Sequence, residues 1–226
     1  MWHWQDFFGY LISAYILGGV LTTLWLTLAG MAGGLVLGSV LALSRRSRRR
    51  PWRMLAAFYV WLFRGTPLLV QLLVIYTCLP LAGLRLSVIE SALLGLVLNE
   101  AAYLAEIIRA GLDAVPRGQV DAAQAIGLRP WLALRLVVAP QALRVVIPPL
   151  GNSVNGLLKT TSITSVISME ELLRRTQLLI ADRFEVLELF AVAAIYYLLL
   201  TSAWELVQRR LERRFGRGTT MAGEAR

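Results

Sequence analysis

The 226-residue chain combines a hydrophobic content of 57% with a mean hydropathy of +0.62 and only 16% charged residues. This composition is typical of an integral membrane protein and excludes an ordinary soluble domain. The net charge of +9 does not indicate nucleic-acid binding, because the basic residues gather at the ends of hydrophobic runs. A single histidine, His3, and a single cysteine, Cys78, leave no credible metal site, catalytic triad or intramolecular disulfide, so we predict no catalytic residue.

Five apolar runs are long enough to cross a membrane, since roughly 20 residues in a helix span the ~30 Å hydrocarbon core. They lie near Ala14 to Leu43, Met54 to Leu79, Val88 to Ile108, Leu136 to Ile167 and Val186 to Val207. Helix is preferred to strand because backbone polar groups in lipid must be satisfied within the segment. The first and fourth runs exceed the required length, so we expect tilting, kinking or protrusion. The predicted fold class is all-α: one membrane domain over residues 1–226 with five transmembrane helices.

Arginines after two of these runs predict the orientation. The segment after the first run contains Arg45, Arg46, Arg48, Arg49, Arg50 and Arg53, and the segment after the fifth contains Arg209, Arg210, Arg213, Arg214 and Arg217. Cationic loops of membrane proteins are retained in the cytoplasm. An odd number of spans therefore places the amino terminus outside and the carboxyl terminus, with a flexible tail from about 213 to 226, in the cytoplasm.

A polar segment at about 115–135 separates the third and fourth runs. Pro116 is expected to start a short helix, Gly127 to close it with a left-handed cap, and Pro130 to begin a second short helix. Small residues give the first helix a shallow surface that permits close approach of a partner protein: Ala122, Ala123 and Ala125. The alternative is an ordinary amphipathic helix at the membrane interface. The flanking arginines place this segment in the cytoplasm.

This segment resembles the EAA loop of permease subunits of ATP-binding-cassette (ABC) importers. That loop reads Glu-Ala-Ala, three residues, Gly, nine residues, then Ile, any residue, Leu and Pro. The corresponding positions here hold Asp121, Ala122, Ala123, Gly127, Val137, Ala139 and Pro140. Aspartate keeps the charge of glutamate, and Val137 and Ala139 keep apolar character. The resemblance therefore implies that the loop couples the permease to an ATPase.

Four further stretches resemble the polar amino-acid subgroup of these permeases, which includes histidine, arginine, glutamine and glutamate systems. They are residues 64–71 (RGTPLLVQ), 99–109 (NEAAYLAEIIR), 115–119 (VPRGQ) and 158–162 (LKTTS). The last departs from the common Lys-Asp-Thr-Ser form, because Thr160 stands where aspartate is usual. A carboxylate at that position is therefore not available to fix Lys159.

The resemblance implies a type I ABC importer of the bacterial inner membrane. It implies a dimer with an identical or related second permease subunit, two cytoplasmic ATPase subunits that bind ATP and Mg, and an external, periplasmic solute-binding protein. The chain itself would then be no enzyme and bind no cofactor. ATP would drive alternating access by bringing the ATPase subunits together against the helix at Asp121 to Gly127, provided that it binds one arrangement more tightly than the other.

Ionisable residues in the third run are the first candidates for a substrate site, because such residues are rare within membranes and are usually functional. Glu106 and Arg109 share one helical face. They can bind the ammonium and carboxylate of an amino acid, or pair with each other. Glu100 lies nearer mid-span and either contacts substrate or is a protonated packing residue. Asn99 and Tyr103 add hydrogen bonds either to substrate or between helices.

The second run contains a candidate hinge. Pro67 leaves a backbone carbonyl without its donor and kinks the helix, and Thr66 or Gln71 can satisfy that carbonyl. Arg64 belongs to the same motif, and all four residues are assigned to a hinge or to the pathway.

In the fourth run Lys159, followed by Thr160 and Thr161, lines the pathway or ends a helix at its wall. The chief alternative function is an ABC permease for another small solute, namely a metal, an anion or a sugar. A secondary transporter is disfavoured, because it usually has more spans and an internal repeat. A membrane enzyme would need a reactive constellation that the sequence lacks.

Overall fold

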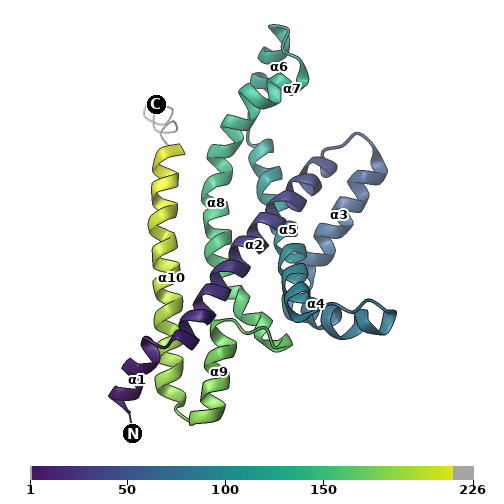
Figure 1. The fold of residues 1–226 in the computed structure, drawn as a ribbon. Coiled ribbons are helices and arrows are strands. Elements are labelled where there is room, and N and C mark those ends of the chain that lie inside the picture. Colours follow the sequence, from purple (N-terminus) through teal and green to yellow (C-terminus); the bar gives the residue numbers. More distant parts are fainter. Residues whose placement is uncertain (1, 216–226) are drawn as a thin grey trace.

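The computed structural model describes residues 2–215, and its regular elements are helices (Figure 1). The first half contains α1 (Trp4–Leu11), α2 (Ala14–Arg45), α3 (Arg50–Gly65), α4 (Leu68–Leu73), the π-helical turn η1 (Val74–Cys78), the 3-10 turn η2 (Leu79–Ala82) and α5 (Val88–Asp113). The second half contains α6 (Arg117–Ala125), α7 (Pro130–Ala133), the π-helical turn η3 (Leu134–Val138), α8 (Ala139–Thr160), the 3-10 segment η4 (Thr161–Ile167), α9 (Leu172–Arg183) and α10 (Val186–Phe215). The predicted all-α class is confirmed.

Four helical segments are long and apolar enough to cross a membrane: α2, α5, the run from Pro130 to Ile167, and α10. The fifth span is a bent pair, in which α3 and the segment Leu68–Ala82 meet at 104°. The predicted span from Met54 to Leu79 is therefore a bent pair of helical segments, and its break lies at the kink that Pro67 predicts. Thr66 is extended, with φ −119° and ψ 143°, because the residue before a proline avoids the helical region.

The centre of the bundle is the crossing of α2 and α5. α2 runs diagonally across the molecule, as the length of the first apolar run predicts (Figure 1). Glycines on α2 allow the two backbones to approach closely. A Cβ on Gly34 would lie 3.1 Å from Cγ of Glu100, and one on Gly38 would lie 3.0 Å from the carbonyl oxygen of Ala101. This is the small-residue packing that holds helices together in lipid, where burial of apolar surface gives no driving force.

The fourth long run is not a uniform helix. It begins with the π-helical turn η3, continues as α8 with Pro148 and Pro149 inside it, and ends in the seven-residue 3-10 segment η4. Long 3-10 and π segments are uncommon and often mark functional sites. The excess length of this run is thus used in irregular turns at both ends, in agreement with the expected kinking.

At the chain's end, residues 213–215 belong to α10 and not to a tail, and 216–226 lie outside the described residues.

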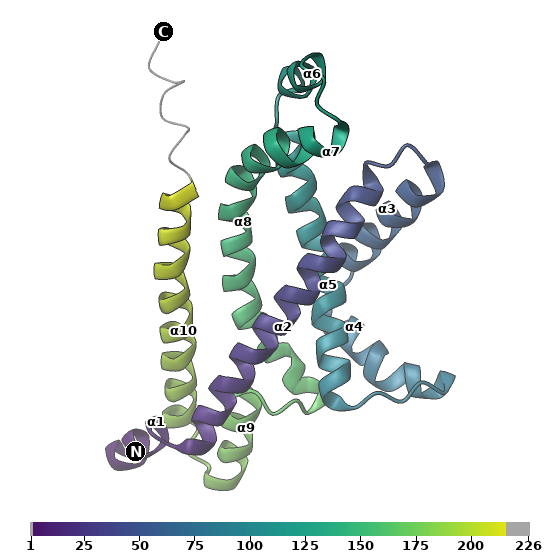
Figure 2. The same cartoon turned by 45° about the horizontal axis from the view of Figure 1, so that its top comes forward.

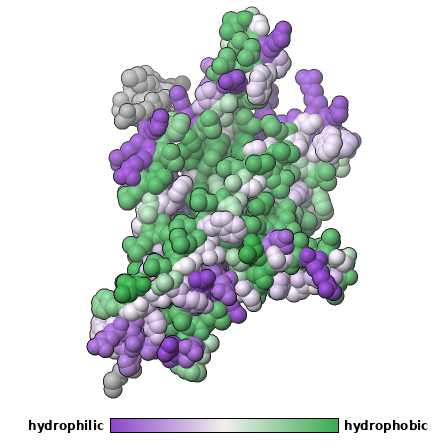
Figure 3. Space-filling view, in the orientation of Figure 1, coloured by the Kyte–Doolittle hydropathy of each residue, from purple (hydrophilic) through white to green (hydrophobic). Residues whose placement is uncertain are grey.

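The helices connect two polar ends. The α2–α3 connection, α6, α7 and the end of α10 lie at one end, and α1 and α9 lie at the other (Figures 1 and 2). Between these ends the visible surface is largely hydrophobic, while hydrophilic residues gather toward the ends (Figure 3). This distribution suits a chain whose middle lies in hydrocarbon and whose ends meet water.

Candidate functional site

The polar segment between α5 and α8 folds as the predicted pair of short helices. Pro116 precedes α6, and Pro130 occupies the first turn of α7. Gly127 has a φ of +80°, which an L-residue with a side chain rarely adopts. Its N–H donates to the carbonyl of Gln124 over 2.9 Å, and the N–H of Leu128 donates to that of Ala123 over 3.0 Å. These two bonds form a Schellman cap, so the predicted role of Gly127 in ending the helix is confirmed.

The exposed face of α6 differs in one respect from the expectation. Asp121, Ala122 and Ala125 are exposed, and Ile126 is 77% exposed. Ala123 is only 3% exposed, so it does not contribute to a docking surface with its neighbours. The reason is the helical period, which turns one of three nearly consecutive alanines inward. Pro140, the last residue of the loop motif, is exposed in the first turn of α8.

A small apolar cluster ties this segment to the transmembrane helices. Val115, Val138 and Ala142 are its buried members, and Val120 of α6 packs against them. Val115 follows α5 directly, whereas Val138 and Ala142 belong to η3 and α8. A displacement of α6 would therefore act on α5 and α8 together.

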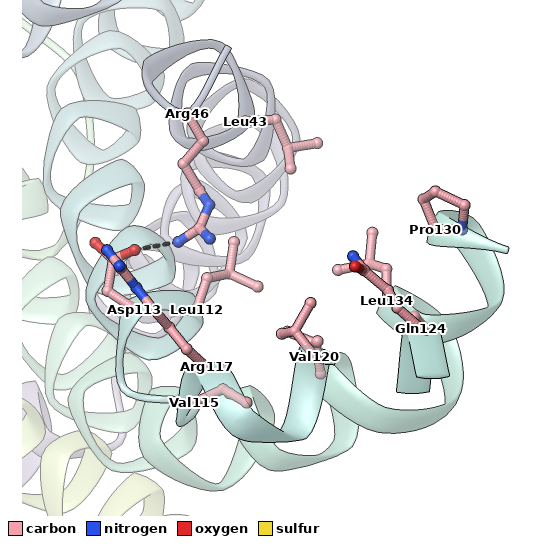
Figure 4. Close-up of a pocket in the computed structure, with 12 residues that line it drawn as sticks. Leu43, Arg46, Leu112, Asp113, Val115, Arg117, Val120, Gln124, Pro130 and Leu134 are labelled. Carbon is pink, nitrogen blue, oxygen red and sulfur yellow. Dashed lines mark hydrogen bonds and ion pairs between the residues drawn. The ribbon is translucent and has the colours of Figure 1, made fainter. Parts of the chain in front are cut away.

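Beside this cluster lies a pocket of about 650 Å³. Figure 4 shows residues of α6 and α7 on one side of it, including Val120, Gln124 and Pro130, and the ends of α2 and α5 on the other, where Arg46 pairs with Asp113. Because this space separates α6 and α7 from the ends of α2 and α5, the two short helices contact the bundle over only part of their surface.

Glu106 and Arg109 are joined to each other, as one of the two sequence hypotheses states. Arg109 Nη2 lies 2.9 Å from Glu106 Oε2, and Arg109 Nη1 lies 2.8 Å from Asp113 Oδ2. Arg45 of α2 also pairs with Glu106, and Arg64 Nη1 of α3 lies 3.9 Å from it. Two carboxylates thus connect three helices through a network of arginines. This arrangement favours the structural alternative for Glu106 and Arg109.

Glu100 is placed differently. It is 8% exposed, faces Gly34 across the α2–α5 crossing, and its Oε1 has no hydrogen-bond partner among the described residues. Asn155 of α8 likewise has a buried side-chain oxygen without a partner there. Buried polar groups are nearly always hydrogen-bonded, so a carboxyl oxygen without a partner in a membrane helix marks a site to be explained.

The hinge residues form the network that the sequence predicts. Pro67 cannot donate to the carbonyl of Phe63, four residues earlier, and Nε2 of Gln71 donates to that carbonyl over 2.9 Å. The same nitrogen lies 2.8 Å from Oγ1 of Thr66. Asn99 of α5 donates to Oε1 of Gln71 over 3.0 Å. Asn99 therefore connects the bend to α5. This contact corresponds to the second sequence hypothesis for Asn99, a hydrogen bond between helices.

The remaining candidates occupy two places. The guanidinium of Arg64 lies 5.4 Å from the ring centroid of Tyr103, a cation–π distance. In the second place, at the end of α8, Lys159 is exposed in the last turn of the helix, and Thr160 is half-buried. Thr161 is buried and its hydroxyl donates to the carbonyl of Leu158 over 2.8 Å. Lys159 and Thr160 are thus accessible to a solute, whereas Thr161 is used in ending the helix.

Sequence reasoning missed a polar junction at the opposite end of the bundle. Glu171 is fully buried and caps α9, where its carboxylate accepts from the N–H groups of Leu173 and Arg174 at 2.9 and 2.8 Å. The hydroxyl of Tyr197 on α10 donates to the same carboxylate over 2.9 Å, and the N–H of Leu172 donates to Thr23 of α2 over 3.3 Å. Burial raises the pKa of Glu171, while these donors act in the opposite direction. Glutamate is not a favoured N-cap, so no sequence signal marked it.

Comparison with known proteins identifies the family. The model of the inner membrane component of binding-protein-dependent transport systems matches residues 34–217. The arginine transport system permease protein ArgU of Corynebacterium glutamicum is 38% identical, with 99% of this chain and 75% of that protein covered. The glutamine transport system permease protein GlnP of Escherichia coli K12 is 37% identical, with 88% and 92% covered.

A solved structure agrees with this result. The crystal structure of an amino acid ABC transporter with histidines contains a chain that is 33% identical, with a TM-score of 0.88, and the match covers 95% of this chain and 99% of that one. The predicted resemblance to permeases of ABC importers is thereby confirmed over nearly the whole chain. The chain belongs to the family of inner membrane components of binding-protein-dependent transport systems.

Proposed function

We propose that the chain is the permease subunit of an ATP-driven importer of polar amino acids and that α6 is the contact with a separate ATPase subunit. The observation that carries the coupling role is the exposed face of α6, with Asp121, Ala122 and Ile126, which ends in the cap at Gly127. The names of the relatives, which are arginine and glutamine permeases, support the amino-acid class.

The contacts of α6 support a route for the coupling. Two ATPase subunits closing on ATP would push on α6 in each of two permease subunits. The pocket beside α6 leaves space for that displacement, and the cluster around Val115 and Val138 would pass it to α5 and α8. ATP shifts the population of states only if the closed ATPase pair favours one arrangement of these helices.

The same two helices carry the groups that we assign to substrate. The buried carboxyl of Glu100 on α5, with its unpartnered Oε1, suits an ammonium group, and the exposed Lys159 with Thr160 on α8 suits a carboxylate. We assign Asn99, Gln71, Thr66 and Pro67 to the hinge, from the hydrogen bonds at the bend. Movement of α5 relative to α8 would then change the distance between the two halves of the substrate site.

Cross-linking tests the coupling contact. In a Cys78→Ser background, Ala122→Cys and Ala125→Cys should form cross-links to the partner ATPase in the assembled complex, because both positions are exposed. Ala123→Cys on the same helix is the matched control, since its side chain is buried. Equal cross-linking at all three positions, or none at any, would show that α6 does not present this face to the ATPase.

Uptake competition tests the substrate class. Membrane vesicles with the complete system would take up labelled arginine in the presence of unlabelled glutamine, glutamate, histidine, sugars or inorganic anions. The proposal requires competition by at least one polar amino acid and none by sugars or anions. Uptake that responds only to sugars, metals or anions would replace the amino-acid assignment while leaving the family unchanged.

Thiol labelling tests the orientation, which we propose to have α1 outside and the α2–α3 connection in the cytoplasm. In the Cys78→Ser background, Ser47→Cys should resist an impermeant reagent in intact cells, and Ala181→Cys should react. Ser47 lies between the arginines that the positive-inside rule retains, and Ala181 lies near the end of α9 at the opposite end of the molecule. The reverse pattern would overturn the orientation.

A further inference from the structure

A groove between α2 and α3 lies outside the coupling segment and the substrate candidates. It has a volume of about 380 Å³. Its lining is apolar apart from a serine and a tyrosine hydroxyl: Val40, Leu41, Ser44, Trp52, Leu55, Ala56, Phe58, Tyr59 and Leu62. The α3 side chains recur at helical spacing, so they form one stripe along the helix. The rim is open, since Leu55 is 61% and Phe58 is 56% exposed, and we call this feature the α2–α3 groove.

One end of the α2–α3 groove meets a cluster of arginines. Arg48, Arg49, Arg50 and Arg53 are exposed, and none has a carboxylate partner within residues 2–215. They differ in this from Arg45 and Arg46, which pair with Glu106 and Asp113. No acidic residue occurs in the sequence between Asp6 and Glu90, so no neighbouring carboxylate on α2, α3 or α4 can neutralise the cluster. Figure 3 shows hydrophilic residues at this end and hydrophobic surface below it.

We propose that the α2–α3 groove binds an anionic phospholipid of the cytoplasmic leaflet. Its acyl chain lies against Trp52, Leu55 and Phe58, and its phosphate is held by Arg48, Arg49 and Arg53. The inference goes beyond the transport function and rests on the orientation proposed above. Basic residues next to a membrane helix attract anionic headgroups, and tryptophan rings favour the level at which headgroup and acyl chain meet.

Charge distinguishes this occupant from a second copy of the chain. Two copies packed through this face about a two-fold axis would bring the same arginines toward each other, and α2, α3 and α4 have no acidic residue to place between them. Like charges opposed across an interface are unfavourable. An anionic lipid supplies both the missing negative charge and an apolar chain to fill the groove.

Fluorescence quenching tests the headgroup contact. The whole permease is reconstituted in vesicles in which either phosphatidylglycerol or phosphatidylcholine carries brominated acyl chains, which quench tryptophan fluorescence. The quenching of Trp52 is obtained as the difference between wild type and Trp52→Phe. Wild type should prefer phosphatidylglycerol. The triple variant Arg48→Gln, Arg49→Gln, Arg53→Gln should lose that preference by about threefold or more. The control Arg210→Gln, Arg213→Gln, Arg214→Gln removes the same charge from the end of α10 and should retain it. Unchanged preference in the first triple variant, or equal loss in both, would overturn the proposal.

Two further variants test the groove itself. Ser44→Phe fills the groove without changing charge, so it should reduce quenching of Trp52 by brominated phosphatidylglycerol; undiminished quenching would contradict acyl-chain binding there. Leu55→Cys in the Cys78→Ser background should not form a disulfide with a second copy in the membrane. A disulfide-linked dimer would show that the groove is a subunit interface and not a lipid site. Retained transport in these variants shows that the complex is assembled.

Discussion

The two ends of the bundle use polar residues in opposite ways. At the α9 end, Glu171 is fully buried, and its carboxylate accepts from two backbone N–H groups and Tyr197. At the α6 end, Asp121 is exposed and makes no ion pair within the described residues. The first end joins α2, α9 and α10, whereas α6 rests on one small apolar cluster beside a pocket.

This difference separates polar groups that stabilise the chain from those that remain for a partner. A buried, satisfied network gives a fixed structure and is costly to interrupt. An exposed helix with little burial contributes little to stability and is free to bind. The comparison therefore predicts that substitutions at the α9 end lower stability, while substitutions on α6 alter coupling with little effect on stability.

The largest effect on stability is expected for Glu171→Ala. It removes the cap of α9 and leaves the hydroxyl of Tyr197 and two backbone N–H groups without an acceptor, which should lower the free energy of unfolding by about 2–4 kcal/mol. Glu170→Ala is the control, because this neighbour is exposed and its nearest cation, Arg175, is 3.8 Å away. Unfolding in mixed detergent micelles measures both. Equal effects would remove the contrast between the two ends.

The arginine network should give an intermediate and asymmetric effect. Glu106→Gln leaves Arg45, Arg64 and Arg109 without their shared carboxylate, whereas Arg109→Gln leaves Glu106 paired with Arg45. Because these side chains are partly exposed, we expect about 1–2 kcal/mol for Glu106→Gln and less for Arg109→Gln. The same unfolding measurement tests this. If both variants kept the stability of wild type and lost substrate binding equally, Glu106 and Arg109 would instead be substrate-binding residues.

A pH dependence should follow from Glu171. Burial raises the pKa of its carboxyl, so the folded state binds the proton more tightly than the unfolded chain. The stability from this group is fully present below the ordinary pKa of about 4.3 and is lost as pH rises through the raised value. The Tm of wild type relative to Glu171→Gln should therefore decrease as pH rises above about 4. An increase would mean that the three donors outweigh burial.

The smallest effect on stability is expected for Asp121→Ala. The side chain is exposed and unpaired within the described residues, so the free energy of unfolding should change by less than about 0.5 kcal/mol. Substrate-stimulated ATP hydrolysis should nevertheless fall. A large loss of stability with coupling intact would place Asp121 with the structural residues.

The features predictable from the sequence were those with local causes. Hydrophobic length alone indicated the spans, and Pro116, Gly127 and Pro130 indicated the caps and starts of α6 and α7, because these residues restrict their own backbone. A donor role for Gln71 was also predictable, as one of two alternatives with Thr66, because both residues lie close to Pro67 in the same apolar run.

Features that depend on distant segments were not predictable. The sequence indicated a kink at Pro67 but not the 104° bend, which Asn99 holds from another helix. The sequence indicated only that Arg45 helps to set the topology, yet Arg45 forms an ion pair with Glu106, which is 61 residues later in the chain. The contact of Glu171 with Tyr197 likewise depends on how α9 and α10 pack. No local pattern records such pairings.

Two substitutions, one near each end of α6, test whether this helix transmits the action of the ATPase. A Cβ at Gly118 or at Gly127 meets no atom within 4 Å, so neither substitution creates a clash. Only Gly127 has a positive φ, where a β-branched side chain is strained.

The measurement is ATP hydrolysis by the reconstituted complex, stimulated by the substrate-loaded binding protein, at matched assembly. If α6 is the coupling helix, Gly127→Val should lower stimulated hydrolysis at least about tenfold, which corresponds to a rise of about 1.4 kcal/mol in the activation free energy of the stimulated reaction. Gly118→Val should remain near wild type. Wild-type stimulation in Gly127→Val, or an equal loss in both variants, would contradict the assignment of α6 as the coupling helix.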